Sequence, residues 1–154
     1  MTNIKKCKSC KSRSVEIFFD FGKMPIVNNL IKNKKEKNKL FPLGLLFCKK
    51  CYFVQTKNKL DPKKCFNKNY PYFSSTSKFW LSHAKKYFEK IKKKIKLKKG
   101  DQIVEIASND GYLLKNFNKK KYKIFGIEPT KPAADIAKRD GVKTYNSFFY
   151  SSFV

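Results

Sequence analysis

The sequence predicts an α/β protein with a small N-terminal zinc-ribbon-like domain, a linking helix and the first part of a parallel sheet. Two Cys-x-x-Cys pairs precede residue 52, an amphipathic helical pattern follows Ser77, and a strand, a turn and a helix follow from Gln102. At 154 residues the chain has room for one ordinary domain or two small ones. The predicted boundaries are residues 1–73 for the metal-binding domain, 74–99 for the helix and 100–154 for the sheet-forming domain.

The two cysteine pairs are Cys7 with Cys10 and Cys48 with Cys51. Two intervening residues let both sulfurs of a tight turn face one point, and two such turns can enclose a zinc ion tetrahedrally. The N-terminus resembles no secretory signal, so a reducing compartment and a metal are favoured over disulfides. Four thiolates leave no open coordination position, which indicates a structural role. An iron–sulfur cluster and four buried free cysteines remain alternatives.

The spacing between the cysteine pairs is unusual. The 37 residues between Cys10 and Cys48 exceed the roughly 15–20 of a simple zinc ribbon, so we expect an insertion at residues 23–45. Cys65 has no partner of this kind and is interpreted as a small buried hydrophobic residue.

Lysine dominates the composition. Lys and Arg number 37 against 11 Asp and Glu, giving a formal net charge of +26, yet 41% of residues are hydrophobic, which excludes a disordered basic tail. Only Arg13 and Arg139 are arginines, whereas specific phosphate and base contacts favour Arg. AT-rich coding bias therefore explains the charge better than nucleic-acid binding, although a basic zinc-ribbon module that binds nucleic acid stays the alternative function. The longest apolar stretch, Leu40 to Phe47, is too short to span a bilayer, and we expect a cytoplasmic protein without a membrane partner.

The second half alternates helical and strand patterns. Ser77 is a predicted N-cap, and apolar residues then recur every three or four positions as far as Ile95. The elements expected after the turn at Lys98 to Asp101 are a buried strand at Gln102 to Ala107, a helix at Tyr112 to Phe117, a strand at Tyr122 to Glu128, a helix at Ala133 to Arg139 and a strand at Val142 to Tyr145.

Acidic residues occur where a nucleoside ligand would need them. Glu105 lies in an apolar strand, so its carboxylate needs a hydrogen-bonding partner or a function. Glu128 ends the second strand, 18 residues after Asp110, where doubly wound folds place the acid that binds ribose hydroxyls. The turn between them has one glycine and lacks the Gly-x-Gly-x-x-Gly that cradles a pyrophosphate. A nucleoside without phosphates, such as S-adenosylmethionine, is therefore the favoured ligand.

Spaced motifs along nearly the whole chain resemble one family. They are the two cysteine pairs, Phe21-Gly22-Lys23-Met24-Pro25, Phe41-Pro42-Leu43, Val54-Gln55, Tyr70-Pro71-Tyr72-Phe73-Ser74-Ser75, Glu105-Ile106-Ala107-Ser108-Asn109-Asp110-Gly111 and Gly126-Ile127-Glu128-Pro129. In this order they resemble the N-terminal part of S-adenosylmethionine-dependent sugar C-methyltransferases with an N-terminal zinc-binding domain, which methylate C-3 of nucleotide-linked keto-deoxysugars. The family motif is usually Glu-x-Gly-x-Asn-Asp-Gly, and Ala107 here replaces its first glycine.

The resemblance implies roles for individual residues. The four paired cysteines would hold structural zinc, and the Tyr70–Ser75 segment would cover cofactor and substrate. Cofactor-binding positions would be Glu105, Ala107, Asn109, Asp110, Gly111, Glu128 and Pro129, and substrate-binding positions Tyr72, Ser74 and Ser75. The implied chemistry is removal of a proton next to a ketone, then methyl transfer to carbon, which needs a general base. The candidates are Tyr70, Tyr72 and His83, although His83 on a helix face is also typical of a packed histidine.

The resemblance further implies the first half of a Rossmann-like class I methyltransferase sheet. The remaining strands and the C-terminal substrate domain of the family would lie beyond residue 154. We therefore expect a fragment that is inactive alone, with a nucleotide sugar as substrate and a second chain as the source of the missing half. A remnant or regulatory subunit that has lost the reaction is the remaining alternative.

Overall fold

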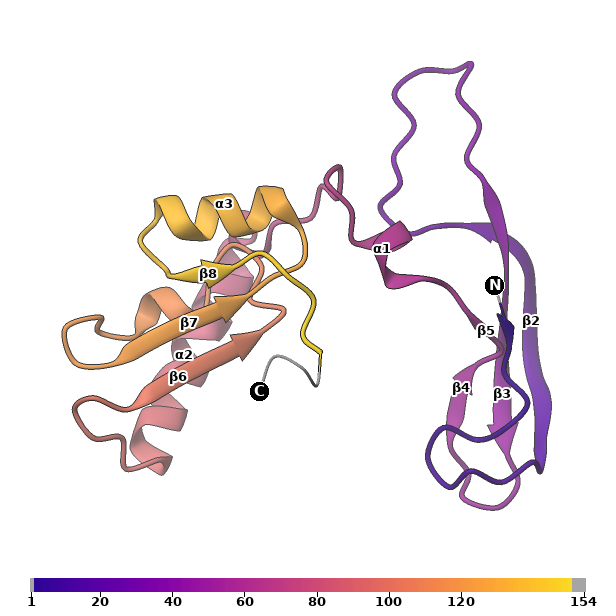
Figure 1. Ribbon diagram of the computed structural model, residues 1–154, viewed down its shortest axis with the longest axis horizontal. Coiled ribbons are helices and arrows are strands. Elements are labelled where there is room, and N and C mark those ends of the chain that lie inside the picture. The colour runs from indigo at the N-terminus through magenta and orange to yellow at the C-terminus, as the bar shows by residue number, and fades with distance from the viewer. Residues whose placement is uncertain (1, 151–154) are drawn as a thin grey trace. The chain divides into compact units, whose positions relative to one another are not determined.

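The structure, a computed structural model, describes residues 2–150 and contains both helices and strands. The chain divides into two compact units, Met1–Cys65 (unit 1) and Phe66–Val154 (unit 2), so that residues 66–73 group with the second unit (Figure 1). Within residues 2–150, no helix has the length and apolar character needed to cross a membrane.

Unit 1 is built from antiparallel strands. The main sheet has the order β2-β3-β4, formed by β2 (Val15–Pro25), β3 (Leu40–Cys48) and β4 (Val54–Thr56). A second ladder pairs β1 (Thr2–Asn3) with β5 (Asn58–Lys59), and the short helix α1 (Pro62–Cys65) follows. Part of the insertion expected at residues 23–45 is thus a long β-hairpin, because both of its ends lie in β2 and β3.

Unit 2 has a three-stranded parallel sheet in the order β6-β7-β8. Its elements are the 3₁₀ turn η1 (Ser74–Thr76), α2 (Lys78–Lys94), β6 (Gln102–Ile106), the 3₁₀ turn η2 (Leu114–Asn116), β7 (Lys123–Ile127), α3 (Lys131–Arg139) and β8 (Thr144–Tyr145). The predicted strands and the two longer helices are therefore confirmed to within a few residues.

Two predicted boundary signals in unit 2 are confirmed. The Ser77 side chain accepts a hydrogen bond from the Trp80 N–H and caps α2 at its N-terminus. Gly100, in the turn that follows α2, has φ 96°, a conformation that glycine adopts without the strain other residues meet.

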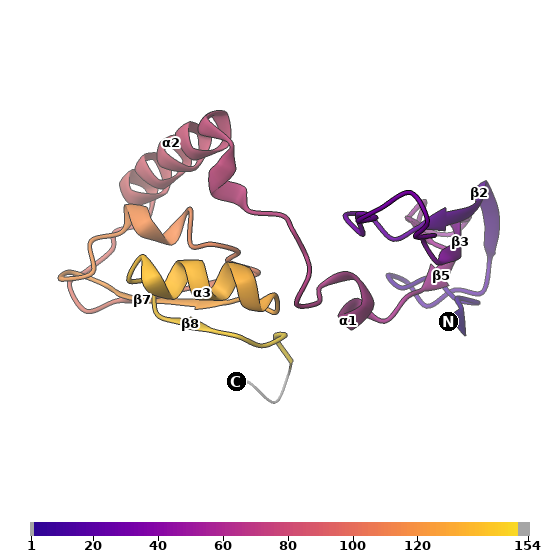
Figure 2. The same ribbon diagram turned by 90° about the horizontal axis from the view of Figure 1, so that it is seen from above.

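The core of unit 2 lies on one face of its sheet. Phe88 of α2, Leu114 and Phe117 near η2, Ile124 of β7 and Ala137 of α3 pack together there. Figure 2 shows α2 and α3 on the same side of the three strands. The sheet is thereby held from one side by both helices.

The helical segment expected at Tyr112 to Phe117 is confirmed only in part, because it forms the short 3₁₀ turn η2 and no α-helix. The Asn116 side-chain amide donates hydrogen bonds to the carbonyls of Tyr112 and Leu113. These carbonyls would accept backbone N–H groups if an α-helix continued. Side-chain competition for backbone carbonyls therefore ends the helical segment early.

The prediction that the strand at Gln102 to Ala107 is buried is wrong. Val104 and Ile106 are each 54% exposed, because alternate residues of β6 face the side of the sheet opposite α2 and α3. Among the described residues β6 pairs only with β7, so its other edge is open. Parallel sheets are normally covered on both faces. The exposed apolar residues of β6 therefore lie on a face of the sheet that residues 2–150 do not cover.

Candidate functional site

The four paired cysteines of unit 1 lie on two loops with the same backbone geometry. The residue after each pair, Lys11 or Tyr52, has a left-handed φ of 63° or 60°. Its N–H donates to the carbonyl of the first cysteine of its pair, with N–O distances of 3.0 Å for Lys11 to Cys7 and 2.8 Å for Tyr52 to Cys48. A left-handed residue other than glycine is strained, so its occurrence in both loops indicates a shared requirement for aiming two sulfurs at one point.

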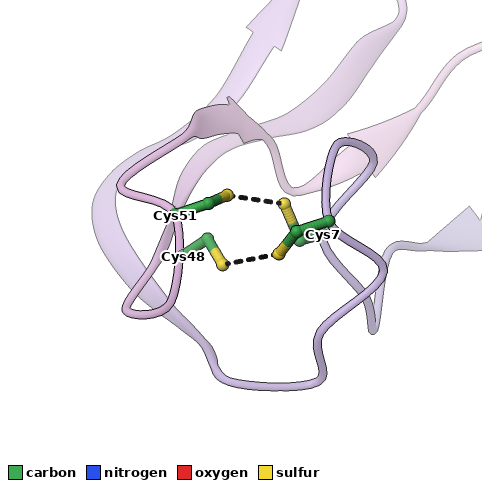
Figure 3. Close-up of side chains that lie close together, drawn as sticks. Cys7, Cys48 and Cys51 are labelled. Carbon is green, nitrogen blue, oxygen red and sulfur yellow. Dashed lines mark hydrogen bonds between the residues drawn. The ribbon is translucent and has the colours of Figure 1, made fainter.

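The four sulfur atoms come together in space. All lie within 4.8 Å of one another, with Cys7 Sγ 3.6 Å from Cys51 Sγ and Cys10 Sγ 3.6 Å from Cys48 Sγ. Figure 3 shows Cys48 and Cys51 on one loop facing Cys7 on the other. Zinc–sulfur bonds of about 2.3 Å in a tetrahedron separate the sulfurs by about 3.8 Å, so these thiols fit a single zinc ion.

Other features of the cluster agree with one ion. Sulfurs that bind different irons of a cluster must lie further apart than sulfurs around one ion, so the compact set favours the single metal. The five cysteines are free thiols, and Cys65 is half-buried and lies outside the set. Burial acts to raise the pKa of Cys7, but N–H groups of Cys10 and Ser9 and the Cys51 thiol outweigh it and lower that pKa to about 7. The N–H of Phe53 acts to lower the pKa of Cys51, but burial and hydrogen bonds with the other three thiols outweigh it and raise that pKa to about 11. The lowered pKa therefore favours the thiolate at Cys7 alone, and binding of a metal by all four cysteines would have to release the remaining protons.

A buried glutamine connects the first cysteine loop to the sheet. Gln55 of β4 accepts a hydrogen bond from the Lys8 N–H at 2.7 Å and donates to the Lys6 carbonyl at 3.0 Å. Both ends of its amide are therefore bonded to the backbone that carries Cys7. Sequence reasoning assigned Gln55 no role, and its only signal was its place in the Val54-Gln55 motif.

The turn after β6 in unit 2 is tightly folded. Ala107, Asn109 and Gly111 have φ values of 59°, 49° and 75°. The N–H groups of Ala107 and Ser108 both donate to the Ile127 carbonyl at the end of β7. A Cβ on Gly111 would meet Val142 Cγ2 at 3.1 Å, so glycine there allows the turn to pack against the core. The turn is thus fixed to the carboxyl ends of the strands.

Protein donors surround the carboxylate of Glu128. Its Oε2 accepts the Asn109 N–H at 2.9 Å, and its Oε1 accepts the Thr130 N–H at 2.8 Å and the Thr130 hydroxyl at 2.5 Å. Glu128 is 4% exposed, so these bonds are largely shielded from water. Sequence reasoning missed Thr130. It is the N-cap residue of α3 but makes no capping hydrogen bond with its side chain, because its hydroxyl donates to Glu128 instead.

Two other carboxylates near this turn keep free acceptor atoms. Among the described residues, the buried Glu105 Oε2 and Asp110 Oδ1 have no hydrogen-bond partner. Asp110 is fully buried, and an unpaired buried carboxylate oxygen is costly unless a ligand satisfies it. Burial, together with the neighbouring carboxylates of Asp110 and Glu128, raises the pKa of Glu105 to about 7. The unpaired oxygens of Glu105 and Asp110 have the chemistry to bind a cation or to accept a hydrogen bond.

A cavity of about 360 Å³ opens beside Glu128. This volume is within the range of small-molecule sites, roughly 300–1,000 Å³. The cavity lies entirely within unit 2 at the carboxyl ends of β6 and β7, the edge at which open α/β sheets bind ligands. Its lining residues are Phe66, Tyr70, Tyr72, Ile106, Ala107, Asn109, Ile127, Glu128, Pro129, Ser147, Phe148 and Phe149.

Comparison with known proteins gives one match to the cysteine-containing region and one to nearly the whole chain. Residues 7–66, which include all four paired cysteines, match a family described as "Putative zinc binding domain". The chain resembles part of a C-methyltransferase. It is 27% identical over 148 residues to the C-methyltransferase NovU of Streptomyces niveus, an alignment that covers 95% of this chain and 35% of that protein. The chain thus spans about a third of the length of this C-methyltransferase, and the resemblance predicted from its motifs is confirmed.

The cavity brings together some of the residues expected from the resemblance to C-methyltransferases. Ala107, Asn109, Glu128 and Pro129 line it, as do Tyr70 and Tyr72. Glu105, Asp110 and Gly111 lie in the same strand end and turn but are not among its lining residues. Phe148 and Phe149 were missed, because they lie far from the motifs in sequence and only folding places them there. Phe66, four residues before the Tyr70–Ser75 segment, belongs to the motif order but was assigned no role.

His83 lies outside the cavity. Its ring stacks on Trp80 with centroids 5.1 Å apart, and both line a separate hollow of about 190 Å³ with Ala84, Tyr87, Tyr112 and Leu113. His83 is nevertheless exposed rather than packed in the core. A role for His83 as a general base stays a prediction.

Replacing Ala107 with glycine is expected to stabilise unit 2 by about 1 kcal/mol. Ala107 has a φ of 59°, a region that costs an L-residue roughly 1–2 kcal/mol and glycine almost nothing. Urea unfolding followed by the fluorescence of Trp80, the single tryptophan, measures the change. Ala133→Gly in α3 is the control and should be destabilising. An Ala107→Gly variant less stable than the original chain would contradict the strain.

The stability of unit 2 is expected to fall as the pH rises from about 5 to 8. The pKa of Glu105 in the folded protein, about 7, exceeds its ordinary value of 4.5, so the folded state binds more protons than the unfolded chain between these values. Allowing for partial exposure, the loss is on the order of 2 kcal/mol. Urea unfolding followed by Trp80 fluorescence at several pH values measures it. Glu105→Gln should flatten the profile, and an equally steep profile in that variant would refute this origin.

Proposed function

We propose that the chain is the N-terminal part of an S-adenosylmethionine-dependent C-methyltransferase that acts on a nucleotide-linked keto-deoxysugar. The observation that carries this proposal is the cavity at the carboxyl ends of β6 and β7, which is lined by the carboxylate of Glu128 and by the turn after β6. The similarity to NovU supports the methyltransferase class. The sugar substrate is proposed from the motif resemblance alone.

Zinc has a structural role in this proposal. Cys7, Cys10, Cys48 and Cys51 would each provide one thiolate, which fills a tetrahedral shell and leaves no position for substrate. The ion would join the loop before β2 to the loop after β3. Thiolate ligands persist in a reducing compartment, and we therefore keep the cytoplasm as the expected location.

The polar groups of the turn suit the two ends of S-adenosylmethionine. A carboxylate has about four acceptor positions, and the three hydrogen bonds to Glu128 leave its Oε2 able to accept one more, from a ribose hydroxyl. The unpaired oxygens of Glu105 and Asp110 lie in the strand end and turn beside the cavity and not in its lining, so a contact with the ammonium group of the methionine end requires them to become accessible when the cofactor binds. The cofactor supplies a methyl group activated by a sulfonium centre. Ala107 and Pro129 would line the nucleoside side of the cavity.

Residues of the Tyr70–Ser75 segment would face the substrate. Tyr70 and Tyr72 line the cavity, where a phenol group could hold or transfer the proton next to the ketone or donate to the enolate oxygen. Ser74 is buried and Ser75 half-buried, and both precede the N-cap of α2. We propose Tyr72, Ser74 and Ser75 as substrate contacts.

Turnover would require further polypeptide. The bare face of the sheet and the open edge of β6 are the surfaces on which additional strands and helices would complete a parallel sheet. We propose that the same polypeptide or a second chain supplies these parts. The 154-residue chain alone is then expected to transfer no methyl group to a 3-keto sugar nucleotide, and measurable turnover by it would contradict this part of the proposal.

Titration of the ¹⁵N-labelled, zinc-loaded chain with S-adenosylmethionine tests the cofactor site. We expect saturable chemical-shift changes at the amides of Ala107, Asn109 and Ile127, with no comparable change around β2. Adenosine should perturb the residues near Glu128 and leave Glu105 unaffected, because it lacks the methionine end. Shifts confined to the lysine-rich surface, or none at all, would exclude this site and favour a different ligand.

A further inference from the structure

Three hydrogen bonds fix the segment that forms one wall of the cavity to the turn after β6. The Ser74 N–H donates to Asn109 Oδ1 at 2.8 Å, and Asn109 Nδ2 donates to the Tyr72 carbonyl at 3.2 Å. The Ser75 N–H donates to Asp110 Oδ2 at 2.9 Å. The side chains of Asn109 and Asp110 thus bond to the Tyr72 carbonyl and to the N–H groups of Ser74 and Ser75.

These three bonds are at least partly shielded from water. Asn109 is 8% exposed and Ser74 is 7% exposed, so the bond between them is buried. A buried backbone N–H that loses its acceptor costs about 1–3 kcal/mol. Residues 70–73 form no regular helix or strand, so side-chain partners matter more for their placement than they do within a ladder.

Asn109 itself is held from two directions. Its backbone N–H donates to Glu128, and its φ of 49° is a conformation in which asparagine is among the best-tolerated residues after glycine. Thr130 in turn donates to Glu128 twice. A continuous set of hydrogen bonds therefore runs from the start of α3 through Glu128 and Asn109 to the segment before α2.

Tyr70 and Tyr72 of this segment form, together with Phe66, a row of aromatic rings along the cavity. The rings of Phe66 and Tyr70 are 5.2 Å apart, and those of Tyr70 and Tyr72 are 6.5 Å apart. All three line the cavity. The Tyr72 carbonyl is bonded to the Asn109 side chain, so the placement of this row depends on that bond.

We infer that Asn109 is a positioning residue that fixes the Tyr70–Ser75 segment, and with it the aromatic wall of the cavity, before any ligand binds. Both functional groups of its side-chain amide are bonded to backbone, which leaves Glu128 as the acidic side chain that lines the cavity. This role goes beyond the cofactor contact proposed for Asn109 above. It concerns the architecture of the cavity and does not depend on which ligand occupies it.

Hydrogen–deuterium exchange on the full zinc-loaded chain without ligand tests the inference. Asn109→Gly removes the side chain yet keeps a residue that tolerates the left-handed backbone. We expect exchange at the amides of residues 73–76 to accelerate at least tenfold. Asn116→Gly is the matched control, because that asparagine also bonds to backbone in unit 2, but only to Tyr112 and Leu113 just before η2. Unchanged exchange in Asn109→Gly, or an equal acceleration in Asn116→Gly, would overturn the inference.

A conservative variant separates positioning from general destabilisation. Asn109→Asp retains an oxygen that accepts the Ser74 N–H but loses the amide that donates to Tyr72. Slow exchange at Ser74 should therefore be restored relative to Asn109→Gly, and loss of this protection in Asn109→Asp would count against the assigned bond.

Ligand affinity gives a second readout, which rests on the proposed function. We expect Asn109→Gly to weaken S-adenosylmethionine binding at least fivefold while Asn116→Gly leaves it within twofold. Equal affinities for the original chain and Asn109→Gly would overturn the claim that the segment forms the binding wall. If the original chain binds no S-adenosylmethionine, the proposed function fails, and the exchange experiment still decides the role of Asn109.

Discussion

Replacing Cys48 with serine is expected to remove the metal and unfold unit 1. Cys48 is fully buried and its sulfur lies 3.6 Å from that of Cys10, and among the described residues the set of possible ligands around this point consists of the four paired cysteines. Loss of a residue that only supports a metal ligand weakens metal binding by up to about a hundredfold. Loss of the ligand itself should therefore lower the metal affinity by more than that. Because structural zinc contributes roughly 10–16 kcal/mol to small zinc domains, slow hydrogen exchange in β3 should be lost as well.

The control for this experiment is Cys65→Ser, which changes the thiol outside the cluster. It should retain one zinc per chain, measured by inductively coupled plasma mass spectrometry on dialysed protein. Unfolding of unit 2, followed through Trp80, should be unchanged in both variants. Full zinc content in Cys48→Ser would show that the four thiols are not the metal site.

Replacing Glu128 with glutamine is expected to destabilise unit 2 by about 2–3 kcal/mol, although the side chains have nearly the same shape. Three donors point at the carboxylate, from Asn109 and Thr130. A glutamine amide has one acceptor oxygen and one donor nitrogen, so in either orientation an N–H faces another N–H. Urea unfolding followed by Trp80 fluorescence measures the loss, and S-adenosylmethionine affinity should fall at least tenfold.

Thr130→Ser provides the matched control for Glu128→Gln. It keeps the hydroxyl that donates to Glu128 and removes only a buried methyl group, worth about 1 kcal/mol. Its affinity for the cofactor should be unchanged. A Glu128→Gln variant with the stability and affinity of the original chain would mean that the carboxylate neither braces the turn nor contacts ligand.

The metal cluster could be predicted from sequence because its information is local. Each pair of thiols is set by a two-residue spacing, and Cys7 and Cys48 need only be brought together by the fold. The capping role of Ser77 and the positions of the strands along the chain in unit 2 were predictable for the same reason. Such features depend on residues close together in the chain or on short rules of periodicity.

Features that depend on distant contacts could not be predicted. The role of Asn109 requires a segment 35 residues earlier in the chain. Thr130 is only two residues from Glu128, but the sequence does not tell whether its hydroxyl caps α3 or donates to that carboxylate. The apolar pattern of β6 correctly indicated a strand. It could not tell whether both faces are covered by the described part of the chain, because Val104 would be apolar in either case.

Calorimetric titration of S-adenosylmethionine into zinc-loaded chain, with zinc determined on the same sample, tests the central claim most directly. The claim is that the chain, with a four-thiolate zinc site and a nucleoside cavity lined by Glu128, is the N-terminal part of a C-methyltransferase. The predicted result is one zinc and one bound S-adenosylmethionine per chain. Absence of binding by a chain that holds its zinc and remains folded would contradict the account.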